Sequence, residues 1–242
     1  MRADELRAAF DGFPPEWLEH LGGWTPEAID RVVDRVRAVS GSAPIAPPDP
    51  WRALRLVGPK QVRVVILGQD PYPTAGHADG LAFSSGGGRP PSLRRIFAVL
   101  AQDRPGFQPP PHARLDAWAR QGVLLLNTAL TVEVGRIGSH LACGWQALTR
   151  EVIRALIYRP QPPVFLLWGT KAKGFFDEAL QEVPADRAAG RAVRPELRVL
   201  TTRHPSNDFR REFMAEGSHF QATAHLVDWW RLDDLQMGLP GC

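Results

Sequence analysis

The sequence predicts an α/β fold: a three-layer α/β/α arrangement with a central four-stranded parallel sheet and helices on both faces. Short apolar runs alternate along the chain with amphipathic helical segments. Such runs are typical of strands buried on both faces. Strands that alternate with helices favour a parallel sheet with right-handed crossovers. The predicted strands cover residues 62–67, 122–126, 163–168 and 197–202.

We expect residues 1–242 to form a single domain, with residues 1–42 as a helical extension packed on it. Within that extension, Thr25 is the expected N-cap of a helix that starts at Pro26. The proline-rich stretch 43–50 is not a domain boundary, because apolar residues resume directly after it.

The remaining helices follow from apolar periodicity and capping residues. Ser92 is the expected N-cap of the first of them, which packs its apolar side inward. Further helices are expected over residues 115–120, 144–158, 170–180 and 218–230, and a surface loop over 183–195.

Composition limits the class of protein. Hydrophobic residues make up 44% of the chain, but no apolar run has the length of a membrane span. The N-terminus lacks the pattern of a signal peptide. Cys143 and Cys242 form neither a disulfide framework nor a metal-ligand spacing. We therefore expect a cytoplasmic protein without cofactor or metal, and the net charge of +3 is compatible with a nucleic-acid partner.

Polar residues follow each predicted strand at its carboxyl end. They are Asp70, Asn127, Thr170 and His204. Strands of a parallel sheet all point the same way, so these residues are expected to converge on one edge. Open α/β sheets bind their ligands at that edge.

The chemistry of these residues suits a nucleobase. Asp70 could act as a general base for water or stabilise a cation, and Asn127 could read an amide-like edge. His204 could donate to a developing oxyanion, while Tyr72 and Phe83 could enclose a flat ring. Taken singly, each has a structural interpretation as a turn cap, a strand-end cap, a loop histidine or a core aromatic. Together they indicate hydrolysis at a nucleobase.

Several sequence blocks occur in a characteristic order. They are Gly68-Gln-Asp-Pro-Tyr72, Gly80-Leu-Ala-Phe-Ser84, Pro90-Pro-Ser-Leu93, Gly122-Val-Leu-Leu-Leu-Asn127, Leu130-Thr-Val132, Ser139-His140, Gly144-Trp145, Leu167-Trp-Gly169 and His204-Pro-Ser206. In this order the chain resembles family 1 uracil-DNA glycosylases. The resemblance runs from about residue 45 to about residue 206 and is weaker over 213–220.

The resemblance implies a role for each residue of the first blocks. Asp70 would orient or activate the water that attacks C1′ and would stabilise the oxocarbenium-like sugar. Gln69 would hold the flipped nucleotide through its backbone, and Tyr72 would close the pocket where thymine carries its methyl group. Phe83 would stack on uracil, and Asn127 would read its N3 and O4 edge.

The resemblance also implies how the leaving group and the DNA are held. His204 would stabilise the O2 charge of the leaving uracil, and Ser92, Thr170 and Ser206 would grip flanking phosphates. The partner would be uracil-containing DNA, single- or double-stranded, acted on by a monomer in base excision repair. The sequence does not indicate a proteinaceous inhibitor or a replication partner.

The chain departs from the family pattern at three places. Pro73 stands where the family most often has His, and Thr170 replaces a usual Ser. After Ser206 the family usually has an apolar residue that wedges into the duplex. Here Asp208 falls at that position, where DNA phosphates would repel it, and Phe209 is the candidate wedge one residue later.

Three other functions stay open at this point. The first is a non-catalytic protein that binds uracil or damaged DNA, and the second is a glycosylase that acts on another damaged base or on mismatched thymine. The third is an α/β hydrolase of free nucleosides, which would not need the phosphate-gripping Ser92 and Ser206. The cysteine count excludes an iron–sulfur glycosylase.

Overall fold

The computed structural model describes residues 1–181, 196–208 and 210–233. Its centre is a parallel four-stranded sheet in the order β3-β2-β5-β6. The strands are β2 (Val64–Gly68), β3 (Val123–Asn127), β5 (Val164–Trp168) and β6 (Val199–Thr202). The first three are buried along their whole length, as the continuous apolar runs predict. The predicted fold class is confirmed.

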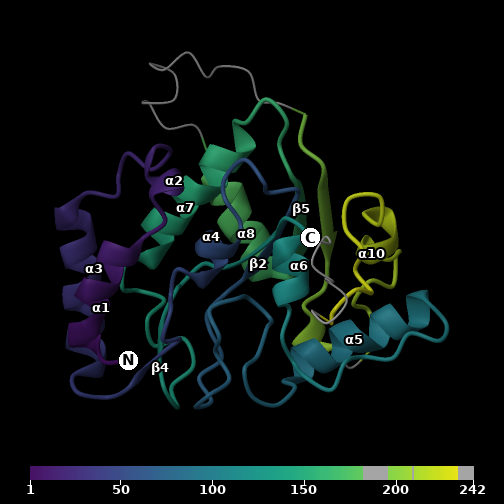
Figure 1. Cartoon of the computed structure of the whole chain (residues 1–242), viewed down its shortest axis with the longest axis horizontal. Coiled ribbons are helices and arrows are strands. Elements are labelled where there is room, and N and C mark those ends of the chain that lie inside the picture. Colours follow the sequence, from purple (N-terminus) through teal and green to yellow (C-terminus); the bar gives the residue numbers. More distant parts are fainter. Residues whose placement is uncertain (182–195, 209, 234–242) are drawn as a thin grey trace, which may run out of the picture.

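Helices cover both faces of this sheet (Figure 1). The helices α7 and α8 lie on one face, and α5, α6 and α10 lie on the other. The bounds are α4 (Arg52–Leu56), α5 (Pro91–Asp103), α6 (Asp116–Arg120), α7 (Trp145–Ile157), α8 (Thr170–Ala179), the 3₁₀ helix η2 (Pro205–Asn207) and α10 (His219–Ala222). A two-stranded antiparallel sheet of β1 (Ile45–Ala46) and β4 (Val132–Glu133) was not predicted. None of the helices in the described ranges combines the length and apolar character needed to cross a bilayer.

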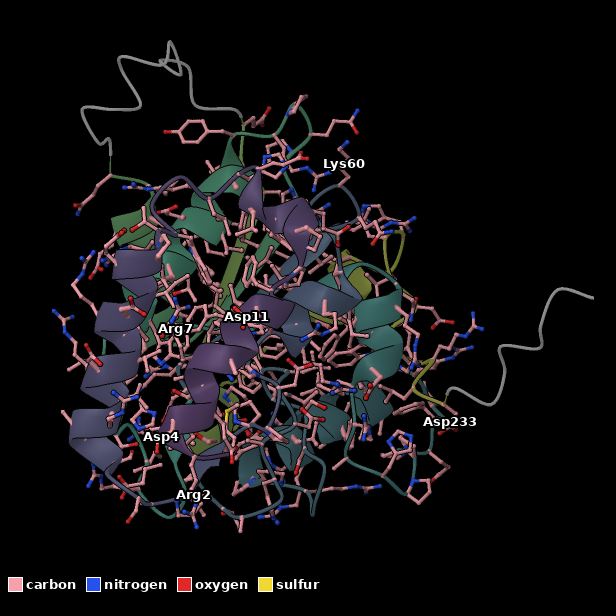
Figure 2. All side chains as sticks on the ribbon, turned by 60° about the vertical axis from the view of Figure 1, so that its left-hand side comes forward. Arg2, Asp4, Arg7, Asp11, Lys60 and Asp233 are labelled. Carbon is pink, nitrogen blue, oxygen red and sulfur yellow. The ribbon has the colours of Figure 1, made fainter. Side chains whose placement is uncertain are left out.

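The N-terminal segment packs on the side of α7. It contains α1 (Ala3–Ala9), η1 (Phe10–Gly12), α2 (Pro15–Leu18) and α3 (Pro26–Ser40). Thr25 caps α3 as predicted, since its hydroxyl accepts a hydrogen bond from the amide of Ala28. The indole of Trp51 donates to the carbonyl of Ala9 over 2.7 Å, which ties the segment to the rest of the core. Figure 2 shows Arg2, Asp4, Arg7 and Asp11 along its exposed side.

Two helix predictions were wrong in detail. Helix α5 starts at Pro91 with Pro90 as its N-cap, so Ser92 lies inside the first turn. Its hydroxyl bonds to the Tyr72 hydroxyl instead of capping the helix. The predicted helix 218–230 is limited to His219–Ala222. Thr223 ends it, because its hydroxyl accepts the indole N–H of Trp229 and draws the following chain back on the helix. The predicted loop 183–195 lies outside the described residues.

Candidate active site

The carboxyl ends of the four strands meet at one edge of the sheet. Gly68 at the end of β2 pairs in register with Asn127 at the end of β3. On the other side, a Cβ added to Gly169, just after β5, would lie 2.9 Å from the Cβ of His204 after β6. The structure therefore brings together the predicted site residues that follow these strands.

Asp70 is half-buried in this edge and held by one backbone amide. Its Oδ2 accepts a hydrogen bond of 2.8 Å from the N–H of Gly138, in the segment between β4 and α7. Burial raises the pKa of the Asp70 carboxyl, and the Gly138 hydrogen bond offsets this only in part. A fixed carboxylate of raised basicity suits the activation of water. The neighbouring Ser139 and His140 belong to the ordered sequence blocks, but nothing in the sequence indicated a role for Gly138.

Gln69 contributes its backbone to the turn after β2. Its carbonyl oxygen accepts hydrogen bonds from the hydroxyl of Thr128 at 2.8 Å and from the amide of Ala129 at 2.9 Å. These bonds join the turn after β2 to the turn after β3. Gln69 and Thr170 also line a hollow of about 270 Å³ at this edge.

Asn127 is placed by the pairing of β3 with β2. A Cβ at Gly68 would lie only 2.1 Å from the Asn127 Oδ1, so only glycine leaves room for this side chain. The Asn127 side chain is 8% exposed. The side-chain amide of Asn127 has no hydrogen-bond partner among the residues that the structure describes. Its oxygen and its NH₂ group are therefore an acceptor and a donor for a ligand.

Phe83 and Tyr72 form an aromatic wall beside these groups. Phe83 has φ +65, which is rare for an aromatic residue, and its ring centroid lies 5.2 Å from Trp168 and 5.8 Å from His204. The Tyr72 hydroxyl donates to the carbonyl of Phe83 at 3.3 Å and lies 2.8 Å from the hydroxyl of Ser92. Burial raises the pKa of Tyr72 to about 12, so the phenol is neutral.

His204 is held in one tautomer. Its Nδ1 accepts a hydrogen bond of 3.2 Å from the amide of Ser206 and lies 2.8 Å from the Ser206 hydroxyl. An Nδ1 that accepts from an amide carries no proton, so the proton of the neutral ring is on Nε2. Burial lowers the pKa of His204. The ring is therefore neutral near pH 7 and has one N–H to donate.

The predicted phosphate contacts differ in their accessibility. Thr170 and Ser206 are exposed, whereas Ser92 is 4% exposed and bonded to Tyr72. Phe209, the candidate wedge, lies outside the described residues. Asp208 does not stand at the surface as the sequence suggested, because its carboxylate turns inward and forms an ion pair with Arg95 on α5.

Asp79 supports the site and was missed by sequence reasoning. Its carboxylate accepts hydrogen bonds from the amide of Leu81 at 3.1 Å and from the hydroxyl of Ser84 at 2.6 Å, on either side of Phe83. The guanidinium of Arg52 lies 3.5 Å from it. Asp79 therefore shapes the loop that carries Phe83. Only its position next to the Gly80–Ser84 block hinted at this.

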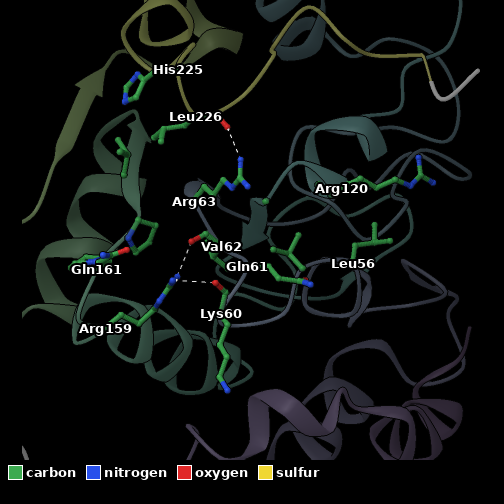
Figure 3. Close-up of a pocket in the computed structure, with 16 residues that line it drawn as sticks. Leu56, Lys60, Gln61, Val62, Arg63, Arg120, Arg159, Gln161, His225 and Leu226 are labelled. Carbon is green, nitrogen blue, oxygen red and sulfur yellow. Dashed lines mark hydrogen bonds between the residues drawn. The ribbon is translucent and has the colours of Figure 1, made fainter. Parts of the chain in front are cut away.

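A larger hollow of about 890 Å³ lies at the opposite edge of the sheet, where the strands begin (Figure 3). It is lined by basic side chains, and the guanidinium of Arg159 donates to the carbonyls of Val62 at 2.7 Å and Lys60 at 3.2 Å. It contains none of the predicted site residues. The candidate active site is therefore the carboxyl edge, although the larger hollow lies elsewhere.

Comparison with known proteins agrees with this assignment. Residues 56–229 match the Uracil DNA glycosylase superfamily. The uracil-DNA glycosylase of Albidiferax ferrireducens is 48% identical over 217 residues, which cover 78% of this chain and 84% of that protein. The uracil-DNA glycosylase of Vibrio vulnificus is 44% identical over 191 residues, covering 76% and 78%.

A solved structure shows the same fold. The crystal structure of mimivirus uracil-DNA glycosylase superposes with a TM-score of 0.66 at 25% identity and covers 81% of this chain and 70% of that chain. Sequence match, fold and the ordered motifs at the sheet edge agree, and the chain therefore belongs to the uracil-DNA glycosylase superfamily, in which its motifs fit family 1.

Proposed function

We propose that this protein is a uracil-DNA glycosylase, a hydrolase that flips uracil out of DNA and cleaves its N-glycosidic bond. The reaction releases free uracil and leaves an abasic site in the DNA. It is the first step of base excision repair. One observation carries the proposal: a carboxylate, an amide and a neutral imidazole meet at one sheet edge beside the ring of Phe83. Chemistry on a base requires such a pocket outside the stack.

The pocket selects uracil by its hydrogen-bonding edge. The Asn127 side-chain oxygen accepts from uracil N3–H, and its NH₂ donates to O4. Cytosine has an unprotonated N3 and an exocyclic amine at the same places, so it would face Asn127 with no matching partner. A polar site left unpaired in this way rejects an analogue by roughly 10⁴-fold or more. Phe83 stacks on the ring, and Tyr72 fills the space that the thymine methyl group would need.

Hydrolysis uses Asp70 and His204 on opposite sides of the bond. Water attacks C1′ and its proton passes to the Asp70 carboxylate, whose charge also stabilises the oxocarbenium-like sugar. The C1′–N1 electron pair leaves with uracil as an anion. The Nε2–H of His204 donates a hydrogen bond to O2, where the charge develops. Burial strengthens both contacts because water is excluded.

The DNA is held by hydroxyl groups around the pocket. Thr170 is exposed, Ser206 is exposed with its hydroxyl against His204 Nδ1, and Ser92 lies under Tyr72 at the start of α5. Phe209 remains the candidate wedge. We also propose that the protein acts as a cytoplasmic monomer. One mimivirus structure is a complex with UGI, and the likeness to it supports a test of proteinaceous inhibitors on this protein.

The test is release of free uracil from single-stranded, U:A and U:G oligonucleotides. We expect release from all three and none from matched oligonucleotides that carry cytosine or thymine. Tight uracil-DNA binding without release would instead favour a non-catalytic binder. Release from deoxyuridine that DNA does not inhibit would favour a nucleoside hydrolase, and release of a different base would favour shifted specificity.

A further inference from the structure

We propose that Arg95 and Asp208 are a pair of positioning residues that hold the two DNA-gripping segments of this enzyme in fixed relation. One segment is the start of α5 with Ser92, and the other is the chain after β6 with Ser206. The inference rests on the proposed function, because it assigns how that site holds its DNA.

The pair is buried well beyond an ordinary surface ion pair. The side chain of Asp208 is 3% exposed and that of Arg95 is 17% exposed, and the Arg95 Nε bonds to the Asp208 Oδ2. A buried carboxylate is costly unless it is paired and its remaining oxygen is hydrogen-bonded. Asp208 meets both conditions, which indicates a structural purpose for an acid placed next to the DNA site.

The other carboxylate oxygen of Asp208 bonds to the backbone further along the chain. Its Oδ1 accepts a hydrogen bond of 2.9 Å from the amide of Phe213. The Phe213 ring packs edge-on against Trp168 at 5.3 Å. The next amide, that of Met214, donates to the hydroxyl of Thr202 at 2.8 Å. Asp208 thereby ties the chain after His204 back to the ends of β5 and β6.

The Oδ2 of Asp208 connects this part of the chain to α5 through Arg95. Ser206 precedes Asp208 by two residues, and Ser92 precedes Arg95 by one helical turn on α5. Residues three apart on a helix are neighbours on its surface. The ion pair therefore sits within a few residues of both candidate phosphate contacts. Fixing the separation of the two segments lets both meet one strand without an ordering cost on binding.

The substitution Asp208→Asn gives a test in which the sign of the effect decides. Removing a negative charge beside a DNA site should tighten DNA binding if charge alone matters. If Asp208 positions the segments, binding should instead weaken. We expect KM for a single-stranded uracil oligonucleotide to rise about tenfold or more, with kcat within about twofold of wild type. The variant Arg95→Gln should have the same effect.

Three further measurements separate positioning from other roles. The double variant should bind DNA as well as the single variant that binds less tightly, because both substitutions remove the same contact. The slope of log Kd against log salt should stay unchanged in Arg95→Gln, whereas loss of a direct phosphate contact would lower it by about one. The matched control is the exposed ion pair of Arg37 and Asp4, whose variants Arg37→Gln and Asp4→Asn should leave KM unchanged.

Clear outcomes overturn the proposal. Unchanged or tighter DNA binding by Asp208→Asn would do so, as would a lower salt slope in Arg95→Gln. If Asp208→Asn does not fold, Asp208→Glu and Arg95→Lys keep the charges but shift their reach, and wild-type KM in both would equally overturn it. The binding arm uses undamaged oligonucleotides, so it gives a result even if the wild-type protein releases no uracil, in which case the proposed function alone fails.

Discussion

At the scale of single residues, the site combines a carboxyl group and an imidazole whose pKa values shift in opposite directions. Burial raises the pKa of Asp70 from 3.8 and lowers that of His204 from 6.5. The proposed mechanism needs Asp70 charged and His204 neutral. Protonation of His204 at Nδ1 would also set a second N–H against the amide of Ser206. Both groups therefore favour activity at neutral pH and oppose it on acidification.

The pH dependence of kcat/KM follows from these directions. We expect kcat/KM to be constant near pH 7 to 8 and to fall at lower pH. Protonation of His204 should contribute to the fall with a midpoint below pH 6.5, and protonation of Asp70 with a midpoint above pH 3.8. The measurement is uracil release across this range under conditions where binding is not saturated. In Asp70→Asn, the residual activity should lack the part of this fall that protonation of Asp70 causes. A midpoint at or above pH 6.5 in Asp70→Asn, where Asp70 no longer titrates, would show that the pKa of His204 is not lowered.

Tyr72 is the residue that we expect to exclude thymine. The variant Tyr72→Ala should gain slow release of thymine from T:A or T:G oligonucleotides, because the space for the 5-methyl group opens. Release of uracil should fall by about 10-fold, since the phenol also supports Phe83. Tyr158→Ala, which changes a tyrosine at the end of α7, is the matched control. No thymine release from Tyr72→Ala would remove the assigned role.

At the scale of the elements, the pairing of β2 with β3 sets the position of the Asn127 side-chain amide, which we propose reads the base. Gly68→Ala would place a Cβ 2.1 Å from the Asn127 Oδ1, so one of the two must move. We expect kcat/KM for uracil release to fall by about 10²-fold, because a shift of about 1 Å at a reacting site has that cost.

The control for this change is a glycine with free space. Gly174 in α8 has no atom within 4 Å of an added Cβ. Gly174→Ala should leave activity unchanged and stabilise the protein by up to about 1 kcal/mol, because alanine favours the helix. Equal activity of Gly68→Ala and Gly174→Ala would show that the Gly68–Asn127 contact does not position the base.

The sheet and its functional edge could be predicted from the sequence because their signals are local. Apolar runs mark the strands, and the polar residue after each run lies at the shared edge by topology alone. Long-range contacts have no such signal. The hydrogen bond from Gly138 to Asp70 joins residues 68 positions apart, and the ion pair of Arg95 and Asp208 joins residues 113 apart. Asp208 therefore suggested a surface acid, although its charge is compensated inside the fold.

Side-chain competition explains the helix errors. Ser92 fits the usual composition of an N-cap, but Pro90 takes that position, and the Ser92 hydroxyl bonds to Tyr72 instead. The segment 218–230 has helical periodicity, but Thr223 binds both the carbonyl of His219 and the indole of Trp229. Such tertiary hydrogen bonds override local propensity and cannot be read from spacing.

At the scale of the whole molecule, two buried histidines link its stability to pH. His140 lies between the hydroxyls of Ser40 and Thr131, each at 2.8 Å, and so joins α3 to the segment after β3. His219 accepts the indole N–H of Trp168 at 3.2 Å. Burial lowers the pKa of both histidines to about 4. The folded protein holds them neutral in the range where the unfolded chain takes up protons.

The free energy of unfolding should therefore fall as the pH drops from about 6.5 towards 4. We expect a loss of about 1–2 kcal/mol for each histidine between pH 7 and pH 5, measured by urea unfolding. His140→Gln should have a lower free energy of unfolding than wild type at pH 7, but this free energy should fall less on acidification. His20→Gln, at an exposed position, should lose as much as wild type. Equal losses in all three proteins would show that His140 does not contribute.

The central claim is that the carboxyl edge of the sheet cleaves uracil from DNA with Asp70 as the acting carboxylate. Its most direct test is the single-turnover rate of uracil release from one single-stranded oligonucleotide, compared between wild type and Asp70→Asn. We predict release by wild type, a rate about 10²–10⁴-fold lower in the variant, and DNA affinity within about threefold. No release by wild type, or equal rates in both proteins, would contradict the claim.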